Sequence, residues 1–173
     1  AALHRLARLG KPILLLSNSG KRAAQNEHRL SNLGFDRRDY LGVMSSGEAA
    51  FSALSRRIGQ EIPMGAKVWT HSRDADRSAT QGLNLTAVET PDDADLLLLA
   101  GSQGDQHTMA DYVTLLAKAA ARQVPMICTN PDLEMLTPQG ICFGAGAIAA
   151  RYAQMGGPVD YIGKPYPLIY TEA

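Results

Sequence analysis

The segment IGKPYP, residues 162–167, places a lysine where a cation is unexpected. Its two prolines predict a helix that begins here, because proline is tolerated in the first helical turn, where its missing N–H is not needed. A helix N-terminus carries partial positive charge and attracts anions. We therefore predict that Lys164 and this helix start face a bound anion together. The alternative is an exposed lysine in a turn.

A second segment, ILLLSNSG, carries residues that could meet this anion. Its apolar run predicts a strand, and ligands of parallel sheets bind beyond the carboxyl ends of the strands. Ser17 falls at that end. Its hydroxyl and the backbone N–H groups of Asn18 and Ser19, at the expected start of the next helix, could donate hydrogen bonds to a phosphoryl oxygen. For Ser17 alone, the alternative is a simple helix N-cap.

The elements that would position these residues alternate between helix and strand. The expected elements are a helix at 3–9, a buried strand at 11–17, a helix at 21–33, a strand at 39–46 and a helix at 45–57. Ser45 and Glu48 have the spacing of a capping box at the start of the last helix. This alternation is typical of an α/β protein, in which helices cover a parallel sheet.

A boundary is expected at 59–66, GQEIPMGA, because glycine and proline interrupt it and it shows no period. Beyond it, the alternation restarts and runs to the C-terminus. The expected elements are strands at 67–71, 83–88, 95–101, 124–130 and 159–163, and helices at 74–82, 108–122 and 145–155. Gly156 and Gly157 are expected to end the last of these helices.

Three further segments have competing interpretations. GAGAIAA, residues 144–150, matches a dinucleotide-binding fingerprint, but GICF before it is a poor strand and Asp160 follows too closely. We favour a helix start whose small residues allow close packing. DLEMLTPQG, residues 132–140, is either a binding loop or a surface connection. SRDADR, residues 72–77, lacks the glycine and terminal glutamate of a calcium loop and is interpreted as a solvated helix start.

The amino-acid composition favours a globular domain over nucleic-acid-binding and membrane-spanning proteins. The chain has 173 residues, of which 45% are hydrophobic, and its 17 basic residues balance 17 acidic ones, which favours a globular domain over a nucleic-acid-binding one. No apolar run approaches the ~20 residues of a membrane helix. Four histidines without common spacing are interpreted as structural or surface residues. Cys128 and Cys142 lack metal-ligand spacing and predict free thiols, which fits a cytoplasmic location.

Taken in order, the strand ending in Ser17-Asn18, the stretch TNPD (129–132), GAGAIAA and IGKP resemble one family. The chain resembles the haloacid dehalogenase superfamily of phosphatases, in particular the p-nitrophenylphosphatase-like (NagD-like) subclass IIA, from about residue 11 to residue 170. The resemblance implies catalytic roles for Ser17 and Lys164, and phosphate binding by both residues with Asn18 and Ser19. Ser19 stands where the family usually has asparagine. Asn130 and Asp132 are implied to contact the substrate from a cap.

The resemblance also implies an architecture. We expect a partial Rossmann-like core, a doubly wound parallel sheet built from 1–62 and 158–173, with a large α/β cap inserted at 63–157. The family's Asp-x-Asp motif, which supplies the nucleophile, is expected before Leu3, and its acidic metal-binding motif after Ala173. We therefore expect no metal site in this chain and no activity of the chain alone.

The implied function is Mg²⁺-dependent hydrolysis of a small phosphate monoester, such as a sugar phosphate, nucleotide or aryl phosphate, through an aspartyl-phosphate intermediate. The expected partners are a small phosphorylated metabolite and, through the cap, further copies of the same chain. Neither nucleic acid nor a membrane is expected as a partner. The alternative function is a non-catalytic nucleotide- or phosphate-binding α/β module.

Overall fold

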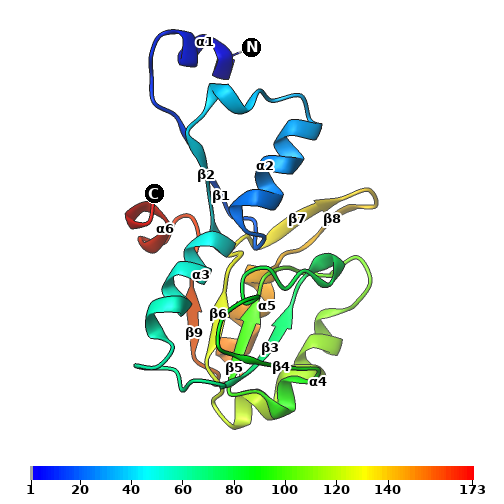
Figure 1. Ribbon diagram of the computed structural model, residues 1–173. Helices are drawn as coiled ribbons and strands as arrows, with labels where there is room; N and C mark the ends of the chain where they lie inside the picture. Colours follow the sequence, from blue (N-terminus) through cyan, green and yellow to red (C-terminus); the bar gives the residue numbers. More distant parts are fainter. Residues whose placement is uncertain (1) are drawn as a thin grey trace.

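The computed structural model describes residues 2–173 and shows a smaller lobe above a larger one (Figure 1). The smaller lobe contains α1 (Ala2–Arg8), β1 (Leu14–Ser17), α2 (Ala23–Asn32) and β2 (Gly42–Ser45). β1 and β2 pair in parallel, with Leu14 opposite Gly42 and Ser17 opposite Ser45. Each of these elements was expected from the sequence, and both strands end at the junction between the lobes.

β1 is a strand, as predicted, but the expectation that it is buried was wrong. Leu14 is exposed and the other three residues of the strand are only half-buried. Within residues 2–173, β2 is the only strand that pairs with β1, and a sheet of two strands with one helix cannot enclose an apolar strand. The neighbouring exposed apolar side chains are Leu6, Leu9, Leu33, Phe35 and Leu41.

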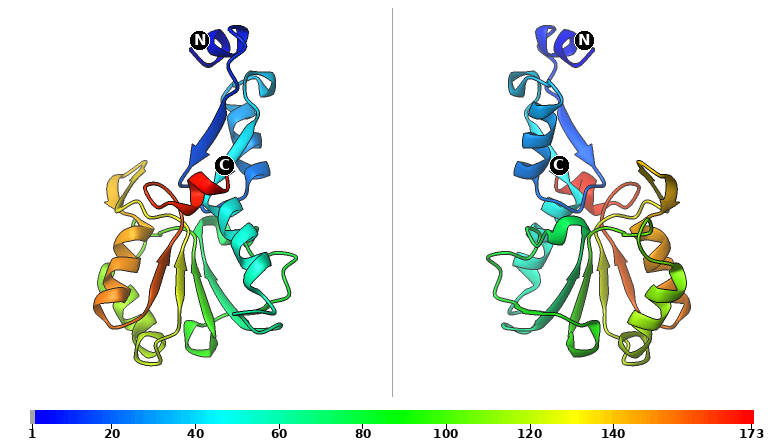
Figure 2. Two further views of the ribbon diagram at one scale, coloured as in Figure 1. Left: turned by 90° about the vertical axis from the view of Figure 1, so that its left-hand side faces the viewer. Right: turned by 90° about the vertical axis from the view of Figure 1, so that its right-hand side faces the viewer.

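The larger lobe is a five-stranded parallel sheet in the order β4-β3-β5-β6-β9. Its strands are β3 (Lys67–His71), β4 (Thr86–Val88), β5 (Leu96–Leu99), β6 (Met126–Cys128) and β9 (Val159–Tyr161). Helices α4 (Met109–Ala121) and α5 (Ala145–Gln154) cover one face, and α3 (Ser46–Arg57) covers the other (Figure 2). This lobe has the three-layer arrangement expected of an α/β protein.

β5 supplies the centre of the core, because all four of its leucines are buried. Successive strand residues point to opposite faces of a sheet. Accordingly, Leu97 and Leu99 join the cluster under α4 and α5, whereas Leu96 and Leu98 join the cluster under α3. The continuous apolar run at 95–101 therefore predicted a strand buried on both faces, and this prediction is confirmed.

Two elements do not join the sheet to which the sequence-based boundaries assigned them. β9, within the predicted core segment 158–173, pairs with β6 in the larger sheet, with Ile127 opposite Asp160. α3, within the predicted core segment 1–62, packs its alanine-rich face on the larger sheet. The reason is that strand pairing and helix packing depend on contacts between distant residues, which the local sequence pattern does not contain.

Two further differences lie near the predicted site. β7 (Glu134–Thr137) and β8 (Gly140–Phe143) form an antiparallel hairpin that projects from the larger lobe (Figure 2), where the sequence indicated only a loop and a poor strand. The last helix, α6 (Leu168–Thr171), begins four residues after Lys164 rather than at it. None of the helices in residues 2–173 is long and apolar enough to cross a membrane.

Candidate functional site

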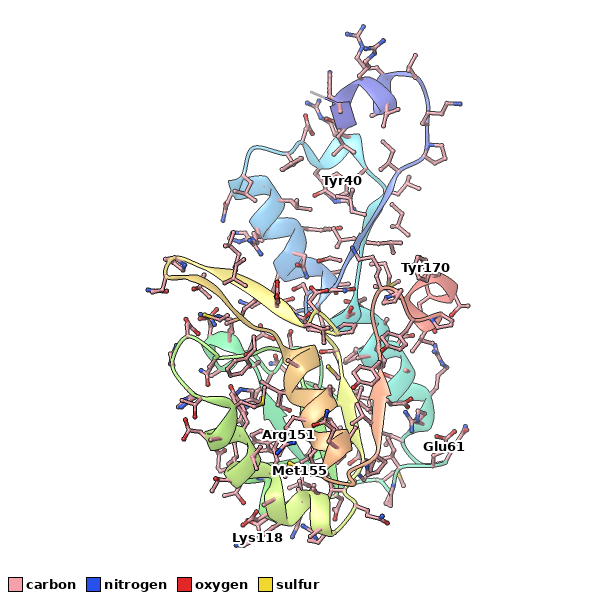
Figure 3. The ribbon with its side chains drawn as sticks, turned by 180° about the vertical axis from the view of Figure 1, so that it is seen from behind. Tyr40, Glu61, Lys118, Arg151, Met155 and Tyr170 are labelled. Carbon is pink, nitrogen blue, oxygen red and sulfur yellow. The ribbon has the colours of Figure 1, made fainter. Side chains whose placement is uncertain are left out.

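A cavity of about 1010 Å³ lies between the two lobes. Its walls come from the turn after β1, one side of α2, the loops after β3 and β5, and the segment that leads into the β7–β8 hairpin. Figure 3 shows that hairpin from behind, passing beneath α2. The lining residues include Ser17, Asn18, Ser19, Lys21, Arg29, Arg73, Ala100, Asn130, Asp132 and Thr137. The cavity thus unites five of the six residues that the sequence selected.

Asn18 connects three of the predicted site segments through its side-chain amide. Its Oδ1 accepts a hydrogen bond from the backbone N–H of Lys164 (2.6 Å), and its Nδ2 donates to the carbonyl oxygen of Lys164 (3.0 Å). The same Nδ2 donates to Asp132 Oδ1 (2.8 Å). Asn18 therefore holds the backbone of Lys164 in place and links it to the other lobe. The sequence assigned only its backbone N–H to the site.

Lys164, the sixth predicted residue, lies at the end of β1 beside the cavity rather than on its wall. Its Nζ donates a hydrogen bond to the carbonyl oxygen of Leu16 (3.2 Å), directly before Ser17. The expected helix start at Lys164 was wrong, because the chain turns between Gly163 and Pro167 before α6 begins. The positive end of a helix is therefore not located at Lys164, and an anion there would not be shared between the lysine and a helix N-terminus. An ammonium carries three N–H donors, so two remain for a ligand.

Ser17 occupies the end of β1, as predicted, and its local contacts are those of a turn. Its Oγ accepts a hydrogen bond from the Ser19 backbone N–H (3.2 Å), which leaves the hydroxyl proton free to donate. The expectation that Asn18 and Ser19 begin a helix was wrong, because α2 starts at Ala23. The Ser19 N–H is therefore engaged by Ser17, so it does not donate to a ligand in this conformation.

Asn130 and Asp132 both line the cavity, and Asp132 contacts the turn after β1 through Asn18. The Asp132 backbone N–H donates to Asn130 Oδ1 (3.2 Å), so the two side chains belong to one turn. The carbonyl oxygen of Asp132 accepts from the Gly146 N–H at the start of α5 (3.0 Å). A Cβ on Gly146 would lie 2.2 Å from the carbonyl oxygen of Pro131, so the small residues of GAGAIAA allow this loop to pack closely.

The same contacts argue against a dinucleotide site at GAGAIAA. The strand before it, β8, belongs to an antiparallel hairpin, whereas the fingerprint requires a parallel strand that leads into the helix. The Gly146 N–H that would face a pyrophosphate is already bonded to Asp132. The interpretation as a tightly packed helix start is confirmed.

Charged residues of the cavity that the sequence did not single out come from the loop before α2, from α2 itself and from SRDADR. Lys21 Nζ lies 3.2 Å from Asp74 Oδ2, an ion pair that joins the two lobes. Arg73 also lines the cavity, and it is bound by Asp105 from the loop after β5. The segment 72–77 was interpreted as a solvated helix start, because its pairing partners lie far away in sequence. Only the fold shows that it forms a cavity wall. The helix expected at 74–82 was wrong, since only a 3-10 turn at Arg73–Ala75 forms there.

No group of three or more His, Cys, Asp or Glu side chains in residues 2–173 is arranged to hold a metal ion. The acidic residues at the cavity are instead engaged individually: Asp74 by Lys21, Asp132 by Asn18, and Asp76 by Ser78. The residues of this chain therefore do not fit a metal site by themselves, and no chemical step of a metal is assigned to them.

A hydrogen-bonded aromatic cluster supports the loop after β5. His71 Nε2 lies 2.8 Å from the hydroxyl of Tyr112, which also accepts a hydrogen bond from the Gln103 N–H (3.1 Å). The Tyr112 hydroxyl can then donate its own proton to His71 Nε2. This hydrogen bond requires an unprotonated Nε2, which is the neutral form of the imidazole. Burial, with a smaller contribution from repulsion by His107, lowers the pKa of His71 to about 4.

Acidification should therefore destabilise the protein through His71. In the unfolded chain this residue titrates at its ordinary value of about 6.5, whereas its pKa in the folded chain is about 4. The unfolded state binds more protons between these values, so the stabilisation present above pH ~6.5 is lost as the pH falls. We expect His71 to account for a loss of about 2 kcal/mol in unfolding free energy between pH 7 and pH 5.

Urea denaturation of the wild type and of His71→Gln at both pH values measures this contribution. Glutamine keeps an acceptor for the Tyr112 hydroxyl but does not titrate, so its stability should fall less. An equal loss of stability in the two proteins would contradict the assignment.

Comparison with known proteins gives structural matches only. No protein-family model and no curated protein matches the chain. A haloacid dehalogenase-like hydrolase from Brucella suis 1330 has a TM-score of 0.85 and 27% identity, over 99% of this chain and 60% of that one. A p-nitrophenyl phosphatase from Archaeoglobus fulgidus has a TM-score of 0.65 and 28% identity, over 98% of this chain and 62% of that one.

A glycerol phosphate phosphatase from Mycobacterium tuberculosis, in complex with calcium, is similar in fold, with a TM-score of 0.74 and 23% identity over 99% of this chain and 49% of that one. The chain thus spans about three fifths of the first two matched proteins, 60% and 62% of their lengths. The α/β fold and the resemblance to p-nitrophenylphosphatase-like members of the haloacid dehalogenase superfamily, both predicted from the sequence, are confirmed.

Proposed function

Because the chain has the fold of the haloacid dehalogenase-like phosphatases, we propose that the protein carrying it hydrolyses a small phosphate monoester. One observation carries the proposal for this chain. The Asn18 side chain forms hydrogen bonds with both the N–H and the carbonyl group of Lys164. The Lys164 ammonium thereby lies at the end of β1, where it binds the Leu16 carbonyl next to Ser17. A hydroxyl and an ammonium at one point are suited to a phosphoryl group.

In this proposal each residue assists the transfer without forming a bond to phosphorus. The Ser17 hydroxyl donates a hydrogen bond to one phosphoryl oxygen, and the Lys164 ammonium stabilises the negative charge as it redistributes. The ammonium does so through the two N–H donors that its hydrogen bond with the Leu16 carbonyl leaves free. Asn130 and Asp132 contact the alcohol part of the ester from the opposite wall.

The nucleophile and the metal belong to the part of the protein that this chain does not represent. We propose an aspartate nucleophile, an aspartyl-phosphate intermediate and Mg²⁺ there. The proposal of a divalent metal is supported by the glycerol phosphate phosphatase from M. tuberculosis, whose structures are described in complex with calcium and with magnesium. When bound, such an ion neutralises phosphoryl oxygens.

We further propose a small phosphorylated metabolite as partner, self-association through the larger lobe, and a cytoplasmic location, with neither nucleic acid nor a membrane bound. The two cysteines are free thiols, which fits a reducing compartment. A phosphate-binding module without catalysis is the second candidate function. It would use the same Ser17, Asn18 and Lys164 groups and would need no nucleophile.

Hydrolysis of phenyl phosphate in the presence of Mg²⁺ tests the proposal. The full-length protein that carries this chain should release phenol, whereas residues 1–173 alone should bind phosphate weakly and release none. Binding without turnover in the full-length protein would favour the second candidate. Metal-dependent turnover by residues 1–173 would contradict the placement of the nucleophile outside them.

A further inference from the structure

Arg73 is the most firmly held cation on the cavity wall. Its Nη1 and Nη2 donate to the two carboxylate oxygens of Asp105, at 2.8 and 2.9 Å, and Nη1 also donates to the carbonyl oxygen of Ser102 (3.0 Å). The Asp105 side chain is only 11% exposed, whereas that of Arg73 is 38% exposed. The guanidinium is therefore fixed by Asp105 and Ser102, while the Arg73 side chain stays partly exposed and lines the cavity.

The hydrogen-bond geometry leaves a defined pair of donors on Arg73. A guanidinium has five N–H groups in a fixed plane, and the contacts with Asp105 and Ser102 use both protons of Nη1 and one of Nη2. Among the described residues, Nε and the second proton of Nη2 have no acceptor. Two parallel N–H groups on one edge match the two oxygens of a carboxylate.

The backbone next to Arg73 is held in an unusual conformation. Asp74 and Ala75 both have positive φ, 58° and 51°, a region that side-chain-bearing residues rarely adopt. The turn is kept in place by hydrogen bonds from the Ser72 hydroxyl to the Asp76 carbonyl (2.7 Å) and from Ser78 to the Asp76 carboxylate (2.6 Å). Strain of this kind persists only where the surroundings enforce it, and it is common at binding sites.

Arg73 lies where its two unpaired N–H groups, on Nε and Nη2, could contact the substrate of the proposed reaction. Arg73 follows β3 in the larger lobe, whereas Ser17 follows β1 in the smaller lobe, and both line the same cavity. The ion pair between Lys21 and Asp74 ties the turn of Arg73 to the loop that follows Ser17. A ligand whose phosphoryl group lies at Ser17 would therefore extend its other end toward Arg73.

We propose that Arg73 binds a carboxylate on the alcohol part of the substrate and so selects phosphate monoesters that carry a second negative charge. This inference rests on the proposed phosphatase function and adds the class of substrate to it. Arg29, which lines the cavity from α2, adds a second positive charge to it. Asp74 forms an ion pair with Lys21, and Asp76 accepts a hydrogen bond from Ser78, so these two carboxylates repel an anionic ligand less.

The test compares phenyl phosphate with 3- and 4-carboxyphenyl phosphate as substrates of the full-length protein. For Arg73→Gln we expect kcat/KM for the better carboxylated ester to fall at least about tenfold, because the paired charge-assisted hydrogen bonds to the carboxylate are lost. The value for phenyl phosphate should stay within about twofold. Arg73→Lys, which keeps the charge but not the paired donors, should lie between the two.

Two further variants keep the test interpretable. Arg77→Gln removes a neighbouring arginine that pairs with Glu89 and does not line the cavity, so it should change neither ester. The double variant Arg73→Gln/Asp105→Asn removes the carboxylate that Arg73→Gln would leave unpaired, and it should show the same selectivity as Arg73→Gln.

The outcomes separate this inference from the function on which it rests. An equal loss for all esters, or no loss for any, in a folded Arg73→Gln protein would overturn the role of Arg73 alone. Hydrolysis of none of the esters by the wild type would overturn the proposed function, and this inference with it. A loss confined to the carboxylated esters supports both.

Discussion

Lys164→Met in the full-length protein should lower the turnover of phenyl phosphate about a hundredfold, which corresponds to roughly 3 kcal/mol of transition-state stabilisation. Methionine keeps most of the aliphatic length of the side chain but removes the ammonium that the proposal places against the phosphoryl group. The Asn18 contacts should survive, because they involve only the backbone of residue 164. The loss should therefore appear in kcat rather than in stability.

Lys118→Met is the matched control for this variant. Lys118 is a surface lysine, 78% exposed, that pairs with Asp92 at the end of the larger lobe away from the cavity (Figure 3). Lys118→Met makes the same chemical change as Lys164→Met. It should leave kcat unaltered, because a surface ion pair far from the cavity contributes little to stability and nothing to catalysis. Unchanged turnover in Lys164→Met, with the fold intact, would contradict a catalytic role. Lys164 would then have only a structural role, through its hydrogen bond with the Leu16 carbonyl.

Gly163→Ala should destabilise the chain by about 3 kcal/mol. Gly163 has a φ of 133°, which only glycine adopts readily. A Cβ there would also lie 2.5 Å from Ser46 Oγ, 2.7 Å from Pro131 Cδ and 3.0 Å from Asn18 Oδ1. These atoms belong to three segments that meet at this point, so none can move without disturbing the junction between the lobes.

Gly10→Ala separates the two causes of that loss. Gly10 also has a positive φ, 68°, but a Cβ there would have no atom within 4 Å. It should therefore cost only the conformational strain, about 1 kcal/mol. Urea denaturation of both variants measures the difference. Equal destabilisation by the two substitutions would show that the packing around Gly163 is looser than the structure indicates.

The local elements of this fold could be read from the sequence because each has a strong local signal. The four leucines of 96–99 predicted a buried strand, and Thr108 with Asp111 forms a complete capping box at the start of α4. Ser45 accepts from the Glu48 N–H as the spacing predicted, but the Glu48 side chain binds Arg22 and the Ala23 N–H instead of closing the box. Half of that motif was therefore replaced by a tertiary contact.

What could not be read from the sequence is which distant segments meet. β9 joined the larger sheet rather than β1, and the β7–β8 hairpin formed from residues with weak strand patterns. The prolines around Lys164 predicted a helix start but belong to a turn that precedes α6. Arg73 looked solvated because its partner Asp105 lies in another loop. Each of these outcomes depends on long-range packing, for which a single sequence carries no local signal.

The position of a phosphate analogue in a crystal structure of the full-length protein tests the central claim most directly. With orthovanadate and Mg²⁺ bound, we expect vanadate oxygens within about 3 Å of Ser17 Oγ and of Lys164 Nζ. The Asn18 amide should still hold the Lys164 backbone. Vanadate bound elsewhere, with no oxygen within hydrogen-bond distance of Ser17 Oγ or Lys164 Nζ, would contradict the assignment of this site.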